Sequence, residues 1–217
     1  MNPLNDFLVR LRLPARVPAP PEFGQPAPFG HVHPETLELL AQRRSCTPQT
    51  LAAPAPEGRQ LQDLLRLAAR APDHGKLFPW RFIIIRGKAK AELAARYEAL
   101  AKDRPDPEKA AGVLFKLKTP PLAIIVVSRV SDGPIPAWEQ TLSSGAVCEN
   151  LMIAATAMGY GANWITDWYA YDADAGKLLG LAEGERVAGF VHLGTSAEAP
   201  LERVRPEVDA LVTDWNG

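Results

Sequence analysis

A nearly uncharged segment in the second half of the chain constrains the fold most strongly. Across residues 138–158 only Glu139 and Glu149 are charged, and most of the other side chains are apolar or small. A helix that is apolar on all sides, rather than along one stripe, must be surrounded by other parts of the protein. Gly159 and Gly161 then interrupt the pattern. The segment therefore predicts a central helix of about 21 residues, whose small side chains allow a neighbouring helix to approach closely.

The same region does not predict a membrane span. Its charge-free stretch, residues 150–166, is 17 residues long and contains polar side chains and glycines, whereas a span needs about 20 consecutive apolar residues. The N-terminal residues also lack the basic segment, apolar core and cleavage site of a secretory signal. We therefore expect a cytoplasmic protein with no membrane partner.

The charge balance and the cysteines exclude further classes. The 24 Lys and Arg residues are offset by 25 Asp and Glu residues, so the chain has no positive field for a polyanion and we expect no nucleic-acid partner. Cys46 and Cys148 show no metal-ligand spacing. We predict that both are reduced thiols and that the chain has no metal site.

Proline marks the N-terminal segment as different from the rest. Of the 21 prolines, 8 lie between Pro3 and Pro34, a density that excludes a regular helix or a central strand. We interpret residues 1–33 as an extended arm and residues 34–217 as one folded domain. The arm is either a loose tail or a strap laid over a neighbouring surface, with apolar anchors at Phe7, Leu8, Leu11, Phe23 and Phe29.

The remaining pattern predicts a mixed α and β domain. Helices are expected from residue 34 to the Arg43-Arg44 pair and over residues 57–71, 88–102, 138–158 and 173–179, and strands over residues 80–85, 122–128, 162–166 and 186–193. This order is not a regular βαβ alternation. It predicts an α+β fold, with a sheet of about four or five strands sandwiched by helices.

Several well-known site motifs are absent. Gly159-x-Gly161-x-x-Trp164 begins like a dinucleotide fingerprint, but it follows a helix and has a bulky indole at the third glycine position. The chain also has no P-loop and no G-x-S-x-G nucleophile turn. These absences exclude the most common nucleotide and hydrolase sites.

Three polar segments are candidate binding sites. Arg43, Arg44 and Ser45 follow the first predicted helix, where they could hold a phosphate or simply form a solvated helix end. Arg70 and His74 lie in a turn between a helix and a strand, a position that often carries binding groups, although His74 could equally stabilise the turn.

The third segment follows the central helix. Trp164, Ile165 and Thr166 lie in a short stretch with a second indole at Trp168. A flat aromatic ligand could lie against these rings. Alternatively, the two indoles fill the core.

Together, these motifs resemble the flavin nitroreductase family, and most closely its compact single-domain members. The resemblance covers about residues 35–195. Its motifs occur in the family's order: Arg43-Arg44-Ser45 at a helix end, then Arg70-x-Pro72-Asp73-His74 and Pro79-Trp80 before a strand, then Gly159-x-Gly161-x-x-Trp164 after the long helix.

The resemblance implies a homodimer in which long helices pair and two FMN molecules sit at the subunit interface. Arg43, Arg44 and Ser45 would hold the ribityl phosphate and the nearby ring edge, and Arg70 and His74 would contact the flavin, some of them from the other subunit. The stretch Trp164, Ile165 and Thr166 would pass along the ring and offer backbone amides to its reactive nitrogen. Residues 154–159 are a weaker candidate for the nicotinamide nucleotide, and Arg203 or Arg205 could reach the phosphate.

On this resemblance we expect an FMN-dependent oxidoreductase that passes electrons from NAD(P)H to a small nitroaromatic, quinone or conjugated acceptor. Because the flavin carries the electron chemistry, no dedicated catalytic side chain is predicted, and Arg70 is the candidate to stabilise reduced flavin. Ile165 replaces a polar residue of some relatives, which leaves the acceptor undefined. Two alternatives remain: a flavin carrier or partner-binding module without turnover, and a relative that consumes flavin.

Overall fold

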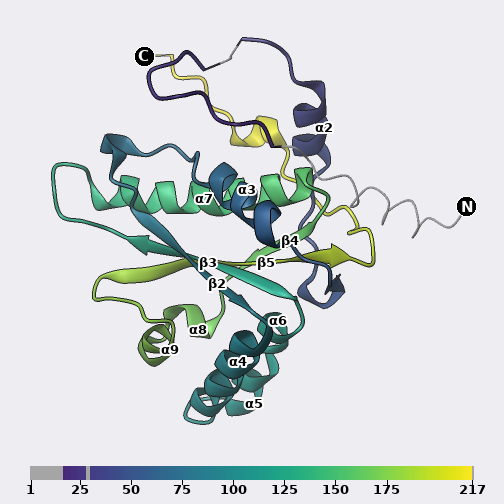
Figure 1. Cartoon of the computed structure of the whole chain (residues 1–217), viewed down its shortest axis with the longest axis vertical. Coiled ribbons are helices and arrows are strands. Elements are labelled where there is room, and N and C mark those ends of the chain that lie inside the picture. Colours follow the sequence, from purple (N-terminus) through teal and green to yellow (C-terminus); the bar gives the residue numbers. More distant parts are fainter. Residues whose placement is uncertain (1–16, 28–29, 217) are drawn as a thin grey trace, which may run out of the picture.

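A five-stranded antiparallel sheet forms the centre of the computed structural model, which describes residues 17–27 and 30–216 (Figure 1). Strand β5 pairs with β3 on one side and with β4 on the other, β2 lies beyond β3, and the short β1 pairs with the end of β5. The strands are β1 (Leu51–Ala52), β2 (Trp80–Arg86), β3 (Leu122–Arg129), β4 (Gly161–Ile165) and β5 (Glu185–Ser196). The predicted α+β fold with four or five strands is confirmed.

Helices cover both faces of the sheet (Figure 1). One face carries α3 (Gly58–Ala68) and α7 (Ala137–Ala157). The other face carries α4 (Gly87–Ala101), α5 (Pro107–Gly112), α6 (Phe115–Lys118), α8 (Trp168–Tyr171) and α9 (Ala173–Leu178). α2 (Pro34–Gln42) lies beside the C-terminal end of α7, away from the sheet (Figure 1).

The alternation of side chains along β3 builds both cores. Ile124 and Val126 pack under α3 and α7, whereas Ile125 and Val127 pack under the helices of the opposite face. All four side chains are completely buried. An inner strand with both faces covered needs apolar residues at every position, which is why this run has no polar alternation.

The long central helix is confirmed as α7, whose 21 residues run from Ala137 to Ala157. Its inner face buries Val147, Cys148 and Leu151, and it packs against both α3 and the sheet. Gly159 follows its end with a φ of 82°, a left-handed conformation that glycine adopts without steric cost.

The expected helices and strands are all present, with ends shifted by a few residues, and the elements that were missed are short. α5, α6 and α8 span four to six residues each, and β1 has two. Local capping starts two of them: the Asp106 side chain accepts from the Lys109 N–H before α5, and the Asp167 side chain accepts from the Trp168 N–H before α8. Hydrophobic periodicity needs more than one turn to be visible, so it did not reveal these elements.

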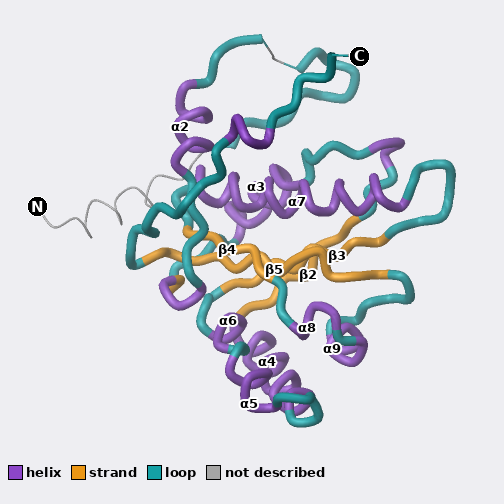
Figure 2. Tube along the Cα trace, turned by 180° about the vertical axis from the view of Figure 1, so that it is seen from behind, coloured by secondary structure: helices purple, strands orange, loops and turns teal. Residues whose placement is uncertain are grey.

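The described part of the proline-rich arm, residues 17–27 and 30–33, contains no helix or strand, and residues 17–27 lie beside the C-terminal tail (Figures 1 and 2). Of the predicted anchors, Phe23 is fully exposed, and Phe7, Leu8, Leu11 and Phe29 lie outside the described residues. Whether the arm is a loose tail or a strap therefore stays a prediction. The division of the chain into an arm, residues 1–33, and a domain, residues 34–217, stays a prediction as well. Among residues 17–27 and 30–216, no helix has both the length and the apolarity to span a bilayer.

Candidate functional site

The predicted Arg-Arg-Ser segment leaves the end of α2 and runs along the outer edge of β4. α2 ends at Gln42, and Arg43 turns the chain into an extended conformation with a ψ of 139°. The Cys46 N–H then donates to the Ala162 carbonyl at 3.0 Å, and the Asn163 side-chain amide donates to the Cys46 carbonyl. These bonds fix the segment beside the strand that carries the predicted ring-contacting residues.

The two arginine side chains are about four-fifths buried and only partly neutralised. Arg43 Nη2 donates to Ser45 Oγ at 3.3 Å, and Arg44 Nε donates to the Leu201 carbonyl at 2.9 Å. The nearest carboxylates belong to Glu149, 4.0 Å from Arg43 Nε, and Glu202, 3.8 Å from Arg44 Nε. Both distances exceed hydrogen-bond length. Arg43 Nε is buried without a hydrogen-bond partner among the described residues, so it is a free donor for an anionic ligand.

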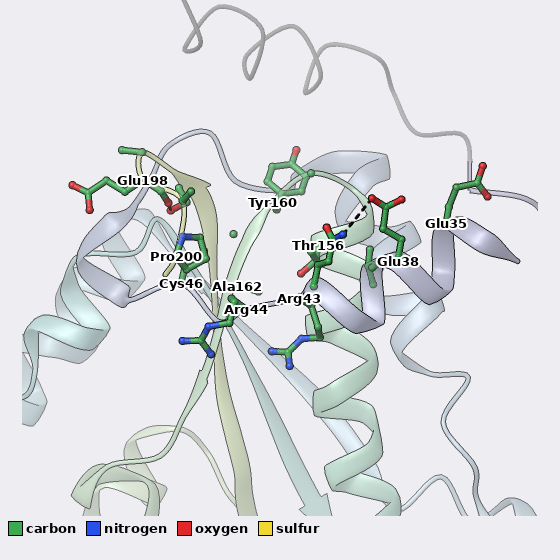
Figure 3. A pocket seen from close by; sticks show the side chains of 17 residues that line it. Glu35, Glu38, Arg43, Arg44, Cys46, Thr156, Tyr160, Ala162, Glu198 and Pro200 are labelled. Carbon is green, nitrogen blue, oxygen red and sulfur yellow. Dashed lines mark hydrogen bonds between the residues drawn. The ribbon is translucent and has the colours of Figure 1, made fainter. Parts of the chain in front are cut away.

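A cavity of about 880 Å³ adjoins the two arginines, between α2, the end of α7, the start of β4 and the segment after β5 (Figure 3). Both guanidinium groups point the same way, along α7 and β4 and away from Tyr160 and Glu198 (Figure 3). The cavity is lined by Glu35, Glu38, Leu39, Gln42, Arg43, Arg44, Cys46, Thr156, Gly159, Tyr160, Gly161, Ala162 and residues 196–200. Its volume is in the range of small-molecule and cofactor sites.

The outer edge of β4 offers free backbone donors. Ala162 directs its carbonyl away from β5, toward Cys46. Backbone groups of a strand alternate between its two sides, so the N–H of Trp164 faces the same outer edge, and Thr166 follows directly after the strand. No strand pairs with this edge in the described part of the chain. The Trp164 amide is therefore unpaired by any described strand on the edge that the Cys46 segment follows.

The side chains of the predicted Trp-Ile-Thr stretch point in different directions. Trp164 is 38% exposed on the α7 face of the sheet. Ile165 packs into the opposite core, and Thr166 accepts a hydrogen bond of 2.7 Å from the Tyr171 hydroxyl. Trp168 is part of that opposite core and its Nε1 donates to the Ala110 carbonyl. Core filling therefore explains Trp168 but not Trp164.

Within one chain, Arg70 and His74 do not join this cavity. Both follow α3, and His74 lies near the N-terminal part of α7, where its Nδ1 is 2.7 Å from a carboxylate oxygen of Glu139. Glu149, beside Arg43, lies ten positions further along α7, a separation of about 15 Å at 1.5 Å per residue. The structure of one chain thus separates the predicted site into two groups.

The loop after His74 has a strained backbone that sequence reasoning did not reveal. Lys76 and Phe78 adopt φ values of 57° and 49°, which are unusual for residues other than glycine. The Asp73 carboxylate holds this conformation by accepting from the N–H groups of Leu77, at 3.3 Å, and Phe78, at 2.8 Å. Strain of this kind is concentrated at functional sites, which makes the exposed Lys76 an additional candidate residue.

One of the two tail arginines approaches the site. Arg205 Nη2 donates to the Arg43 carbonyl at 3.3 Å, and its Nε donates to Glu202 at 3.1 Å. The side chain of Arg203 makes no hydrogen bond or ion pair with the described residues. Of the two, Arg205 is therefore the one positioned near the predicted phosphate group.

Cys148 is not an available nucleophile. Both Cys46 and Cys148 are buried free thiols, as predicted. Burial raises the pKa of Cys148 to about 12, so this thiol stays protonated at neutral pH.

The fold and the open edge of β4 define a class of protein. It is an α+β domain with one antiparallel sheet between helices and an arginine-rich segment along the open strand. Residues 40–195 match the nitroreductase family, and the chain belongs to that family. Its resemblance to flavin nitroreductases is thereby confirmed, and it is an oxidoreductase by family.

Relatives and solved structures agree with this assignment. YdjA of Escherichia coli K12, named for an inferred NAD(P)H nitroreductase activity, is 36% identical over 74% of this chain and 88% of its own length. A nitroreductase-like family protein from Bacillus cereus shares the fold with a TM-score of 0.74, at 23% identity, over 88% of this chain and all of that one. A nitroreductase with bound FMN from Bacteroides fragilis has a TM-score of 0.65, at 22% identity, over 84% of this chain and 99% of that one.

Proposed function

We propose that this chain is an FMN-dependent oxidoreductase that takes hydride from NADH or NADPH and passes electrons to a small nitroaromatic, quinone or conjugated acceptor. The observation that carries the proposal is the pair of largely buried, partly neutralised guanidinium groups of Arg43 and Arg44 beside the open edge of β4. The relative named for NAD(P)H nitroreductase activity and the FMN-bound neighbour support it.

The residues present fit FMN. Arg43, Arg44 and Ser45 would hold the phosphate, which would supply the acceptor that the buried Arg43 Nε lacks. The outward N–H groups of Trp164 and Thr166 would donate to the ring edge. Bound flavin supplies reversible hydride and electron transfer, and the chain's part is to bind it, orient it and stabilise added negative charge.

A second copy of the chain would complete the site. His74 lies too far along α7 to reach the arginines of its own chain, so it would contact the flavin bound by a partner, and Arg70 would contribute from the same or the other subunit. The N-terminal part of α7 exposes large apolar side chains that suit such an interface, with Trp138 69% and Leu142 53% exposed. The assembly would be a homodimer with paired α7 helices.

The nicotinamide nucleotide would enter the open part of the cavity. Thr156 and Gly159, from the predicted segment 154–159, line it together with Tyr160. The acceptor would then use the same space after the oxidised nucleotide leaves, because both must approach the flavin.

Anaerobic addition of NADH or NADPH to the flavin-loaded protein tests the proposal. The yellow absorbance should bleach rapidly and return when a quinone or nitroaromatic compound is added. Unchanged colour would favour a flavin carrier or partner-binding module instead. Loss of intact FMN after repeated cycles, detected by product analysis, would favour a flavin-consuming enzyme.

A further inference from the structure

The indole of Trp164 lies directly over Gly189 of β5. A Cβ atom placed at Gly189 would be 2.0 Å from Trp164 Nε1 and 2.4 Å from Cδ1. Side chains never approach so closely, so only glycine allows this position of the ring. Gly189 does not have a positive φ, so backbone conformation does not require a glycine at this position. The close approach of the Trp164 ring does.

A β-bulge in β5 positions the carbonyl that accepts a hydrogen bond from the indole N–H. Val126 of β3 pairs with Gly189, but the next residue, Val127, pairs with Val187, so Ala188 is an extra residue in β5. A bulge disrupts the local ladder and can re-aim a backbone group. The Ala188 carbonyl accepts a hydrogen bond from Trp164 Nε1 at 3.3 Å. The glycine and the bulge together hold the indole close against β5.

The outer face of this indole has no ring partner among the described residues. Trp80 packs against Phe78 and Phe82, and Trp168 packs against Tyr97 and Tyr169. Trp164 has no such neighbour and remains 38% exposed although its N–H is bonded. It is a fixed, flat apolar surface next to the open edge of β4.

We propose that Gly189 is a positioning residue that holds Trp164 as a stacking surface for the isoalloxazine ring. This inference rests on the proposed FMN site, which it deepens by assigning the surface that the ring contacts. Arg43 and Arg44 would fix the phosphate end, and the Trp164 indole would fix the tilt and position of the ring end. No side chain at position 189 touches the ligand. Its contribution is the absence of a Cβ atom.

FMN titrations of flavin-free protein test this assignment in a double-mutant cycle. Gly189→Ala should displace the indole and weaken FMN binding about two- to tenfold, the range for loss of one aromatic contact. Trp164→Ala should weaken it to a similar extent. Gly189→Ala should have no further effect in the Trp164→Ala background, because the methyl group then meets no ring. The visible absorption band of bound FMN should also shift in each single variant, which loss of stability alone would not cause.

Two further variants complete the design. Gly112→Ala, at an exposed helical glycine with no atom within 4 Å of the added Cβ, should leave FMN binding unchanged. Trp164→Phe, which keeps a flat ring without the N–H, should bind FMN more tightly than Trp164→Ala and tests the surface even if Gly189→Ala does not fold. Wild-type affinity in Gly189→Ala, or an equal loss in both backgrounds, would overturn the inference. Failure of the wild-type protein to bind FMN would instead overturn the proposed function itself.

Discussion

The backbone N–H of Cys46 donates a 3.0 Å hydrogen bond to the carbonyl of Ala162, which joins the segment after α2 to the outer edge of β4. These residues are more than one hundred positions apart in the sequence. The bond places Arg43 and Arg44 beside the strand whose amides face outward, and so brings an anion site and a ring-edge site together.

Substitution of the paired arginines should weaken FMN binding without unfolding the protein. We expect Arg44→Ala to lower the affinity by about 1.5–3 kcal/mol, the range for a hydrogen bond to a charged group. Arg43→Ala should have an effect of the same size. Titration of flavin-free protein with FMN measures both. Arg96→Ala, which removes an exposed arginine of α4 on the opposite face, is the matched control and should bind FMN normally.

A site shared between two copies predicts recovery when two inactive variants are co-expressed. Arg44→Ala and His74→Ala would each damage both sites of their own homodimers, but a mixed dimer would contain one intact site. Random assortment makes half of the dimers mixed, so about a quarter of sites should bind FMN tightly. Co-expression of Arg44→Ala with Arg43→Ala should give no recovery, because both residues serve the same chain's site. Absence of recovery in the first pair would place His74 outside the site of a partner.

The ion pair between Arg81 and Glu185 should stabilise the fold in a defined pH range. Arg81 donates to both carboxylate oxygens, at 2.7 and 2.6 Å, and lowers the pKa of Glu185 to about 2. A carboxyl whose pKa is lower in the folded than in the unfolded chain stabilises the fold above its unfolded value. That contribution is lost as the pH falls from about 5 to about 2.

Glu185→Gln should therefore reduce the free energy of unfolding at pH 7 by about 2–3 kcal/mol and flatten its decline below pH 5. Denaturant titrations at pH 7 and pH 3.5 provide the comparison. An unchanged pH dependence in Glu185→Gln would show that other carboxyls control acid stability.

Buried His192 should also make the stability of the fold depend on pH, beginning at a higher pH than Glu185 does. Both of its ring nitrogens lack hydrogen-bond partners among the described residues, and burial, with a contribution from nearby Lys90, lowers its pKa to about 3. Because the unfolded chain binds this proton more readily, stability should fall as the pH drops below about 6.5. His192→Phe keeps a ring beside Phe190 and should be more stable than wild type at pH 5, with a smaller difference at pH 8. Equal pH dependence of the two proteins in thermal denaturation would contradict this interpretation.

Sequence patterns were sufficient for the parts of the fold that depend on burial. The runs that form α7 and β3 are apolar because the protein surrounds them, so their composition alone indicated a helix-covered sheet. Arg43 and Arg44 were correctly expected at a helix exit, since helix ends follow local rules. The short helices α5 and α8 begin at single capping contacts, and α5, α6 and α8 are all too short to show a hydrophobic period.

The geometry of the candidate site depends on contacts that sequence spacing does not contain. The fit of Trp164 over Gly189 requires the register between β4 and β5 and the bulge at Ala188. The strained φ values of Lys76 and Phe78 arise from the Asp73 carboxylate closing its own loop. The predicted role of His74 requires a second chain, and the sequence of one chain does not define the position of its partner.

Titration of the flavin-free protein with FMN, followed by visible absorbance, tests the central claim most directly. We expect a saturable spectral change with one FMN bound per chain and a strong loss of affinity in Arg44→Ala. A spectrum that is simply the sum of free flavin and protein at every ratio would contradict it.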